Sequence, residues 1–349
     1  MTGAYVSRPA VVLAGHRVTT DQLLEDLRHR HADHPRLGAF LRVVANCGVS
    51  TRYLTRPLDH HSLSHEASVQ ERTTTAFGDA LAMAERAARQ VLESHALTPA
   101  DVDAVITSHT TSWGVPNMDV HLINALGLRP DARHLAMTTL ACAGGAQALV
   151  RAADMVAARP GSTVLVVVTE AISSVCTNPH DTGIEAIIYR ALFGDSAGAV
   201  LVTGSPLGPG LRIGGTWEYT LPESTDRYYG RLDGTGLHFD STKAALRAAK
   251  DVLPHLLTWL GPRDVPDWAV VHPGSPRIIT DVTDGLGLGP QDTRHSHSSL
   301  AENGNLGGVA VLDVLRRTHT EPPADGTRGV LAAFGPGFSA AALRGTWHG

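Results

Sequence analysis

The chain of 349 residues is 43% hydrophobic and 18% charged, which is enough apolar material for one large two-lobed globule or two ordinary domains. Its formal net charge is -5 at pH 7, and acidic and basic residues are interspersed, so the sequence offers no broad basic surface for a phosphate backbone. Nucleic acid is therefore not an expected partner, and the apolar content does not suit a disordered chain.

Helical and β-rich patterns alternate along the chain. Apolar residues and alanines at helical spacing predict helices over residues 23–31 and 73–95, and Thr98-Pro99 opens a short helix. Strand and helix patterns then alternate over 102–107, 119–126, a run ending at 140, 143–159 and 164–169. The second half repeats this order over 198–202, 211–217, 242–260, 268–271, 309–317, 331–334 and 340–343. The alternation predicts a layered α/β sheet with no low-complexity linker between the halves.

The three cysteines are Cys47, Cys142 and Cys176. They are too few and too scattered for a disulfide framework, and they show no paired zinc spacing, so we expect no metal and a reducing, cytoplasmic environment. The apolar run at residues 11–14 is shorter than the core of a signal peptide, and no stretch approaches the roughly 20 apolar residues that span a bilayer. No membrane association is expected.

Cys142 is the candidate nucleophile because it follows a β-like run and directly precedes a predicted helix. Gly144 and Gly145 remove side-chain bulk at the first turn, where unpaired N–H groups favour a thiolate by about 0.3 to 1 kcal/mol. A lone cysteine is also a common small core residue, and that reading is favoured until other residues are considered. Cys142-Ala-Gly-Gly-Ala is echoed by Asn305-Leu-Gly-Gly-Val, which is weak evidence for an internal duplication.

His272 and Asn305 also lie at turns that follow or precede predicted elements. His272 ends the run Trp268-Ala-Val-Val and is followed by Pro273 and Gly274, which places an imidazole at the carboxyl end of a strand, where α/β sheets carry sites. Asn305 leads into the helix at 309–317, so a helix cap is its ordinary interpretation. Taken one at a time, neither residue indicates catalysis.

Five motifs together resemble one family, the type III polyketide synthases that include chalcone synthase. The motifs occur in the family's order and approximate spacing: Ala141-Cys142-Ala-Gly-Gly, Ala191-Leu-Phe-Gly-Asp195, His272-Pro-Gly274, Gly304-Asn-Leu-Gly-Gly308 and Phe334-Gly-Pro-Gly-Phe338. The resemblance covers nearly the whole chain, starting at the segment 46–53. It implies a thiolase-like five-layered αβαβα fold with two pseudo-duplicated halves, which we place at residues 1–205 and 206–349.

The resemblance also implies the chemistry. The counterpart of Cys142 takes an acyl starter from coenzyme A and holds the growing chain, while those of His272 and Asn305 stabilise the enolate that forms when malonyl-CoA loses carbon dioxide. Preorganised donors of this kind are worth about 3 kcal/mol each. Protonated His272 would also lower the pKa of Cys142. Apart from the CoA thioesters no cofactor is implied, and the product would be a pyrone or a phenol.

Other residues acquire expected roles from the same resemblance. Phe193 and Phe239 resemble the two gatekeeper phenylalanines between the CoA tunnel and the elongation cavity. Further expected pocket residues are Thr110, Ile172, Val175, Gly230, Gly307 and Pro336. Ile172, Val175 and Gly307 stand where plant enzymes usually have threonine, threonine and serine, so these walls should be more apolar. This favours an alkyl or acyl starter over a p-coumaroyl starter.

Recognition of the CoA phosphates departs from the plant pattern. Of three basic positions on an N-terminal helix only Arg42 remains, with Ala39 and Asn46 at the other two. Arg52, Gly274 and Arg277 are the further candidates for CoA binding, with simple exposure to solvent as the ordinary reading of both arginines.

Alternative functions remain open from the sequence. A ketoacyl synthase III-like enzyme uses the same three residue types but performs one condensation, and Pro273-Gly274 and the Gly335-Pro-Gly337 loop argue against it. A cysteine hydrolase or a catalytically inactive scaffold protein fits less well. The resemblance further implies a homodimer in which the loop Thr110–Pro116 helps to close the partner's cavity.

Overall fold

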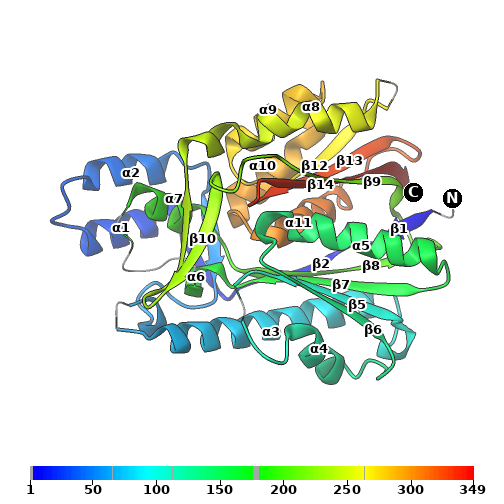
Figure 1. Ribbon diagram of the computed structural model, residues 1–349, viewed down its shortest axis with the longest axis horizontal. Coiled ribbons are helices and arrows are strands. Elements are labelled where there is room, and N and C mark those ends of the chain that lie inside the picture. The colour runs from blue at the N-terminus through cyan, green and yellow to red at the C-terminus, as the bar shows by residue number, and fades with distance from the viewer. Residues whose placement is uncertain (1–2, 65, 112, 176–180, 182, 263) are drawn as a thin grey trace.

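The computed structural model describes residues 3–349 except positions 65, 112, 176–180, 182 and 263. Figure 1 shows five layers, from α3 and α4 at the bottom, through one part of the sheet, α5 and α11, and the second part of the sheet, to α8 and α9 at the top. The outer and central helices are α3 (Val69–Ser94), α4 (Met118–Leu126), α5 (Gly144–Ala158), α8 (Ala248–Leu260), α9 (Pro276–Gly285) and α11 (Ala310–Thr318). The predicted five-layered thiolase-like fold is confirmed.

The first part of the sheet has a parallel centre. Its strands are β2 (Ala10–Leu13), β5 (Ala104–His109), β6 (Arg133–Thr138), β7 (Thr163–Glu170) and β8 (Ser196–Thr203). β5 pairs in parallel with β6 and β7, whereas β8 runs antiparallel to β7 and β2. β5, β7 and β8 are buried along nearly their whole length, which explains their continuous apolar runs.

The second part of the sheet follows the order β12-β13-β14-β9. Its strands are β9 (Gly210–Thr220), β12 (Trp268–Val271), β13 (Arg328–Gly335) and β14 (Ser339–His348). β12 and β13 are parallel, and β14 is antiparallel to both of its neighbours. The short strand β1 (Ala4–Val6) pairs with β8 on one side and with β9 on the other, so the two parts form one continuous ten-stranded sheet.

The hydrophobic core is layered in the same way. The central cluster joins α5 and α11 to residues from both parts of the sheet, such as Val166 and Leu331. Two outer clusters lie between α3, α4 and the first part, and between α8, α9 and the second part. The central helices approach closely, because a Cβ on Gly145 would lie 2.1 Å from the carbonyl oxygen of Gly308. The two Gly-Gly pairs noted in the sequence therefore have a packing role.

The remaining elements lie around this sandwich. They are β3 (His16–Thr19), α1 (Thr20–Arg30), α2 (Leu37–Ala45), β4 (Thr51–Leu54), α6 (Ile172–Val175), α7 (Ile184–Leu192), β10 (Tyr228–Asp233), β11 (Gly236–Ser241) and α10 (Arg294–Asn303). Short 3-10 helices cover His61–Leu63, Pro99–Asp101, Ala141–Ala143, Lys243–Arg247, Pro290–Thr293 and Gly307–Val309. The helix predicted over 242–260 therefore begins with a tighter turn before α8. Antiparallel β10 and β11 form a hairpin outside the large sheet.

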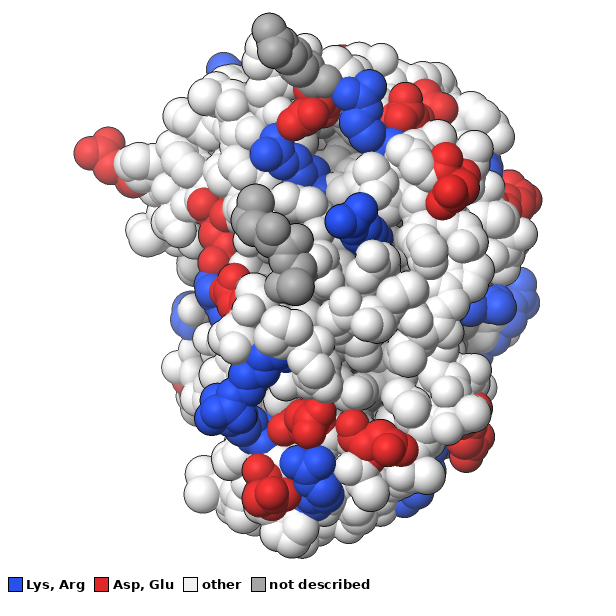
Figure 2. Space-filling view, turned by 90° about the vertical axis from the view of Figure 1, so that its right-hand side faces the viewer, with Lys and Arg blue, Asp and Glu red and all other residues white. Residues whose placement is uncertain are grey.

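The face that carries both chain ends has charges of both signs scattered among uncharged residues (Figure 2). No broad basic area is visible on this face, in agreement with the interspersed charges of the sequence. Within the described part of the chain, no helix is both long and apolar enough to cross a membrane.

Candidate active site

A cavity of about 250 Å³ contains the three predicted catalytic residues, Cys142, His272 and Asn305. Its walls come from the carboxyl ends of β5, β6, β7, β12 and β13 and the segments that follow them, together with α7, the hairpin of β10 and β11, and the turn that carries Asn305. Parallel strands present their carboxyl ends on the same side, which is where open α/β sheets carry their sites. The sequence prediction that these three side chains share one pocket is therefore confirmed by the geometry.

The backbone before α5 holds Cys142 in place. Ala141 has a φ of 47°, a left-handed conformation that is unusual for a residue with a side chain. Its N–H donates a hydrogen bond of 2.9 Å to Oγ1 of Thr110, the residue that follows β5. A Cβ on Gly144 would lie 2.4 Å from Oγ of Ser108, so any side chain at this position would force the buried Ser108 hydroxyl to move. These contacts present the thiol at the start of a buried helix, as expected.

His272 is held by the second part of the sheet. Its backbone N–H donates to the carbonyl of Ala332 at 2.8 Å, and only 1% of the residue is exposed. The next turn brings Gly274 so close that a Cβ there would lie 3.1 Å from Nε2 of His272. The imidazole Nδ1 is buried without a hydrogen-bond partner. The ring is therefore fixed mainly by packing.

Asn305 has a defined amide orientation. Its Oδ1 accepts a hydrogen bond of 3.0 Å from the N–H of Gly307, so Nδ2 is left to face Sγ of Cys142 at 3.9 Å. Its backbone forms a parallel bridge with Phe193, through N–H donation to Leu192 at 2.7 Å and acceptance from Gly194 at 3.1 Å. The catalytic candidate and the gatekeeper candidate are thus parts of one rigid backbone unit.

Burial shifts the pKa values of Cys142 and His272 in the directions that favour the uncharged thiol and the neutral imidazole. It raises the pKa of the Cys142 thiol to about 12, although the hydrogen bond from Asn305 opposes this shift. Burial also lowers the pKa of His272 to about 3. Each group is therefore difficult to ionise by itself.

Glu170 is a cavity residue that the sequence prediction missed. It ends β7, is 2% exposed, and accepts hydrogen bonds from the N–H of Thr110 at 3.1 Å and Oγ1 of Thr111 at 3.2 Å. Burial nevertheless raises the pKa of its carboxyl to about 7. A carboxyl group of this kind can donate or accept a proton near neutral pH. The sequence feature that could have identified Glu170 is an acidic residue at the end of the valine-rich strand β7.

Most of the predicted pocket residues do line the cavity. They are Thr110, Ile172, Phe193, Phe239, Gly307 and Pro336, together with Gly274. Gly307 has a φ of +58°, and a Cβ there would lie 3.1 Å from Cγ of Glu170, so its position is closely packed. The predicted apolar character of the walls holds for Ile172 and is reinforced by Phe334 and Phe338.

Two of the predicted pocket residues lie elsewhere. Gly230 is exposed on β10, opposite Phe239 in the hairpin, and does not line the cavity, so its predicted placement was wrong. Val175 lines a smaller neighbouring hollow with Trp113 and Leu237 instead. Val175 packs against the cluster of Ile172 and Leu237, and Gly230 pairs with Phe239, so both residues neighbour the cavity wall without lining the cavity.

The arginines predicted to bind CoA separate into two groups. Arg42 and Arg277 are exposed, and Arg277 lies 3.5 Å from Asp281. Arg52 has no exposed surface, and its guanidinium donates to the carbonyl of Ala191 at 2.8 Å and 3.1 Å. The predicted CoA contact for Arg52 was therefore wrong. Its cation instead satisfies a carbonyl in the last turn of α7, where a positive charge is favourable.

Comparison with known proteins gives matches over both halves of the chain. Residues 19–206 match the N-terminal domain of the chalcone and stilbene synthases, and residues 215–344 match the C-terminal domain. A phloroglucinol synthase of Pseudomonas fluorescens is 35% identical over 97% of this chain and 98% of its own. A 1,3,6,8-tetrahydroxynaphthalene synthase of Streptomyces griseus is 32% identical over 99% of this chain and 93% of its own.

Two solved structures have the same fold over the full length. The 1,3,6,8-tetrahydroxynaphthalene synthase of Streptomyces coelicolor superposes with a TM-score of 0.93 at 32% identity and covers 99% of both chains. Germicidin synthase from Streptomyces coelicolor, a type III polyketide synthase, superposes with a TM-score of 0.91 at 34% identity, again over 99% of both chains.

Proposed function

Because this chain belongs to the chalcone and stilbene synthase family and is a type III polyketide synthase, we propose that Cys142, His272 and Asn305 are its catalytic residues. The observation that carries the proposal is their convergence in one buried cavity, with the amide of Asn305 3.9 Å from the sulfur of Cys142. From the reaction class and the geometry we assign a role to each of the three.

The first step is loading of the starter. The thiolate of Cys142, formed by proton transfer to His272, attacks the thioester carbonyl of an acyl-CoA. The carbon–sulfur bond to CoA breaks, and the CoA thiolate leaves with the proton from His272. The amide N–H of Asn305, which faces the sulfur of Cys142, stabilises the negative charge that develops on the oxygen of the attacked carbonyl.

The second step is chain extension. Malonyl-CoA loses carbon dioxide, and the electron pair of the broken carbon–carbon bond becomes an enolate whose oxygen is stabilised by His272 and Asn305. The enolate carbon attacks the acyl group on Cys142, and the Cys142 thiolate leaves. The product is a CoA thioester two carbons longer, which can be loaded again. These steps need only the thioester substrates, and we propose no metal or other cofactor.

The cavity walls support a small or aliphatic starter. Ile172 and Gly307 replace polar positions of the plant enzymes, and the aromatic rings of Tyr189, Phe193 and Phe239 occupy the same cavity. Ring centroids of Tyr189 and Phe193 lie 5.6 Å apart in a stacked arrangement. We propose an alkyl or acyl starter and closure to a pyrone or phenol. The names of the relatives, phloroglucinol and tetrahydroxynaphthalene synthase, support a polyhydroxylated aromatic product.

We also propose that the exposed cations Arg42 and Arg277 bind the CoA phosphates. Arg277 is the second residue of α9, whose start borders the cavity through Ser275 and Ile278. Arginine binds phosphate through its planar guanidinium group. We expect Arg42→Ala to raise the KM for malonyl-CoA about tenfold with little change in kcat, because a lost ground-state contact affects binding first. Steady-state kinetics measures this, and an unchanged KM would remove Arg42 from the CoA site.

A homodimer and a cytoplasmic location complete the proposal. The loop that runs from Thr110 on the cavity wall to Pro116 exposes two apolar side chains, with Trp113 45% exposed and Val115 fully exposed. Such exposed apolar residues are typical of an interface, and a second copy of this chain would cover them. The cytoplasm supplies CoA thioesters and keeps a nucleophilic thiol reduced.

The decisive experiment is product analysis. The purified protein is incubated with malonyl-CoA alone and with a panel of aliphatic and aromatic acyl-CoAs, and the products are identified by mass. We expect several extensions of an aliphatic or malonyl starter and no product from Cys142→Ala. Products of a single extension would instead support ketoacyl synthase III-like chemistry, and a strong preference for p-coumaroyl-CoA would contradict the proposed starter class.

A further inference from the structure

The β10–β11 hairpin forms one wall of the cavity without being part of the large sheet. It contributes Tyr228, Phe239 and Ser241 to the cavity lining, yet among the described strands β10 and β11 pair with each other and with no third strand. A two-stranded hairpin is only marginally stable by itself, so its position depends on contacts made by its side chains and its turn. The tip of the hairpin makes an unusually dense set of such contacts.

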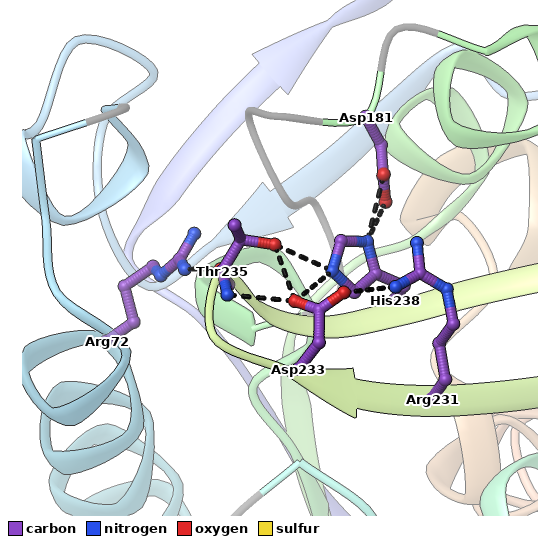
Figure 3. A network of polar contacts seen from close by, with 6 residues as sticks. All are labelled: Arg72, Asp181, Arg231, Asp233, Thr235 and His238. Atoms are coloured by element: carbon purple, nitrogen blue, oxygen red, sulfur yellow. Dashed lines mark hydrogen bonds and ion pairs between the residues drawn. The ribbon is translucent and has the colours of Figure 1, made fainter.

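His238 is at the centre of these contacts (Figure 3). Its Nδ1 lies 2.7 Å and 2.9 Å from the two carboxylate oxygens of Asp181, and its Nε2 lies 2.9 Å from Oδ1 of Asp233. Asp233 also accepts hydrogen bonds from the N–H and the hydroxyl of Thr235, at 2.8 Å and 2.7 Å. Although His238 is surrounded by polar groups, only 5% of it is exposed.

The contacts attach the hairpin to two other parts of the fold. Arg72, which is almost fully buried on α3, donates to the carbonyl of Thr235 at the hairpin tip. Asp181 precedes α7, the helix that ends directly before Phe193. The imidazole therefore connects the hairpin to the segment that leads to the other proposed gatekeeper.

The alternation of side chains along β11 relates His238 to Phe239. Neighbouring residues of a strand point to opposite faces. Leu237 and Phe239 lie on one face, where they pack with Ile172 and with Phe193. His238 therefore points to the opposite face and fixes the same strand from behind. A strand that is held through its polar face keeps its apolar face at a fixed distance from the cavity.

We propose that His238 is a positioning residue that determines product length, because its bridge between Asp181 and Asp233 fixes the wall carrying Phe239. The inference rests on the proposed gatekeeper role of Phe239. Release of the bridge lets the hairpin move outward and enlarges the cavity. Longer polyketide chains or larger starters are then accepted.

The test is a double-mutant comparison of product distributions. His238→Leu, which removes the polar contacts of the imidazole at similar volume, should raise the ratio of longer to shorter products about tenfold, since a misplacement of about 1 Å can change a rate by up to a hundredfold. Phe239→Ala should shift the ratio in the same direction. In the Phe239→Ala background, His238→Leu should have little further effect, because the residue acts through Phe239.

Two control variants separate positioning from general loss of structure. His238→Asn keeps a donor toward Asp181 and should retain products closer to those of the wild type than His238→Leu. His319→Leu removes a partly buried histidine that contacts Trp347 and does not line the cavity, and it should leave the product ratio unchanged. Should His238→Leu not fold, as judged by its circular dichroism spectrum, Asp181→Asn provides the same test from the other side of the bridge.

The outcomes distinguish failure of the gatekeeper role of Phe239 from failure of the positioning role of His238. Unchanged products for Phe239→Ala would reject the gatekeeper role and with it the inference. A shift for Phe239→Ala without one for His238→Leu, or for Asp181→Asn where that variant replaces it, would overturn the positioning role alone. Equal effects of His238→Leu in both backgrounds would also overturn it.

Discussion

At the scale of single residues, the two proposed catalytic groups Cys142 and His272 are both buried in a way that favours their uncharged forms. Burial raises the pKa of Cys142 to about 12 and lowers that of His272 to about 3. A thiol with so high a pKa is almost unreactive at neutral pH, because only the thiolate is nucleophilic. The proposed nucleophilic role of Cys142 therefore requires an acceptor for the thiol proton, and the imidazole of His272 lines the same cavity.

We accordingly expect His272→Ala to slow alkylation of Cys142 by iodoacetamide at pH 7 by about a hundredfold or more, because each pKa unit changes the thiolate fraction about tenfold. The rate is measured by mass spectrometry of the Cys142 peptide, with the exposed-histidine variant His255→Ala as the control. Equal alkylation rates for His272→Ala and the wild type would show that the helix start alone activates the thiol.

Glu170 makes the stability of the fold depend on pH. Its pKa rises from 4.5 to about 7 on burial, so between these values the folded protein keeps a proton that the unfolded chain loses. The free energy of unfolding therefore falls by about 3 kcal/mol in total as the pH rises through this window, because the stabilising contribution of the protonated carboxyl group is lost.

Glu170→Gln removes this dependence. The free energy of unfolding of the variant, relative to that of the wild type, should increase by about 2 kcal/mol between pH 5 and pH 8. Urea denaturation at the two pH values measures the difference, and the exposed carboxylate variant Glu25→Gln serves as a control. A constant difference between variant and wild type would indicate that Glu170 is ionised throughout.

The catalytic candidates could be predicted at this scale because each lies in a short motif at the end of an element. Glu170 carries no such motif, because a single acidic residue at the end of β7 does not differ from the polar residue that ends many ordinary strands. Arg52 was named as a candidate for CoA binding on the assumption that it is exposed, as arginine usually is. Only the fold reveals that its guanidinium is buried and donates to a carbonyl of α7.

At the scale of elements, the contact between the starts of α5 and α11 aligns the two halves of the site. The Cβ position of Gly145 lies 2.1 Å from the carbonyl oxygen of Gly308, and that of Gly308 lies 3.0 Å from the carbonyl oxygen of Ala141. The residues next to Cys142 and Asn305 thus touch backbone to backbone. A side chain at Gly145 or Gly308 would therefore push apart the backbone segments that carry Cys142 and Asn305.

Gly145→Ala should therefore destabilise the protein by about 1 to 3 kcal/mol and reduce kcat, because overpacking here displaces backbone rather than a flexible side chain. Gly78→Ala is the matched control, since Gly78 is also helical and its Cβ would contact nothing within 4 Å. The control should be neutral or stabilising by up to about 1 kcal/mol. Urea denaturation compares the two, and equal stabilities would contradict the close contact.

The elements with strong periodicity could be predicted, and the irregular ones could not. The strands β7, β8 and β12 are continuous apolar runs, and α3 and α5 are rich in alanine at helical spacing. α10 was missed because its sequence Arg-His-Ser-His-Ser-Ser is polar and its buried serines have no apolar pattern. The β10–β11 hairpin was missed because β10 is mostly exposed and alternates poorly.

At the scale of the whole molecule, we expect two copies to associate through the loop at residues 110–116, which precedes α4. Val115 is fully exposed, although its loop begins at Thr110 on the cavity wall. We expect a particle mass of twice that of one chain in light scattering. Val115→Glu should weaken the dimer by about 2 kcal/mol or more, because it places a charge in an apolar interface.

The matched control for this prediction is Val265→Glu, which changes an exposed valine on the segment before β12. Its dimer should dissociate at the same dilution as that of the wild type. A monomeric wild type, or equal dissociation of the Val115→Glu and wild-type dimers, would contradict the proposed interface.

The overall architecture could be predicted because alternating strands and helices leave few arrangements, and the five motifs limited them further. The sequence did not indicate that β1 would join the two parts of the sheet, since three residues carry no periodicity. Pairing over so large a separation depends on the geometry of strands β8 and β9, which no local pattern encodes.

The position of β1 has a consequence for folding. β1 pairs with β8, which begins at Ser196, and with β9, which begins at Gly210, so both of its neighbours are distant from it along the chain. β9 in turn pairs with β14. The strand that joins the two parts of the sheet can therefore be paired only after very distant segments have met, and until then its open edges expose the folding chain to aggregation.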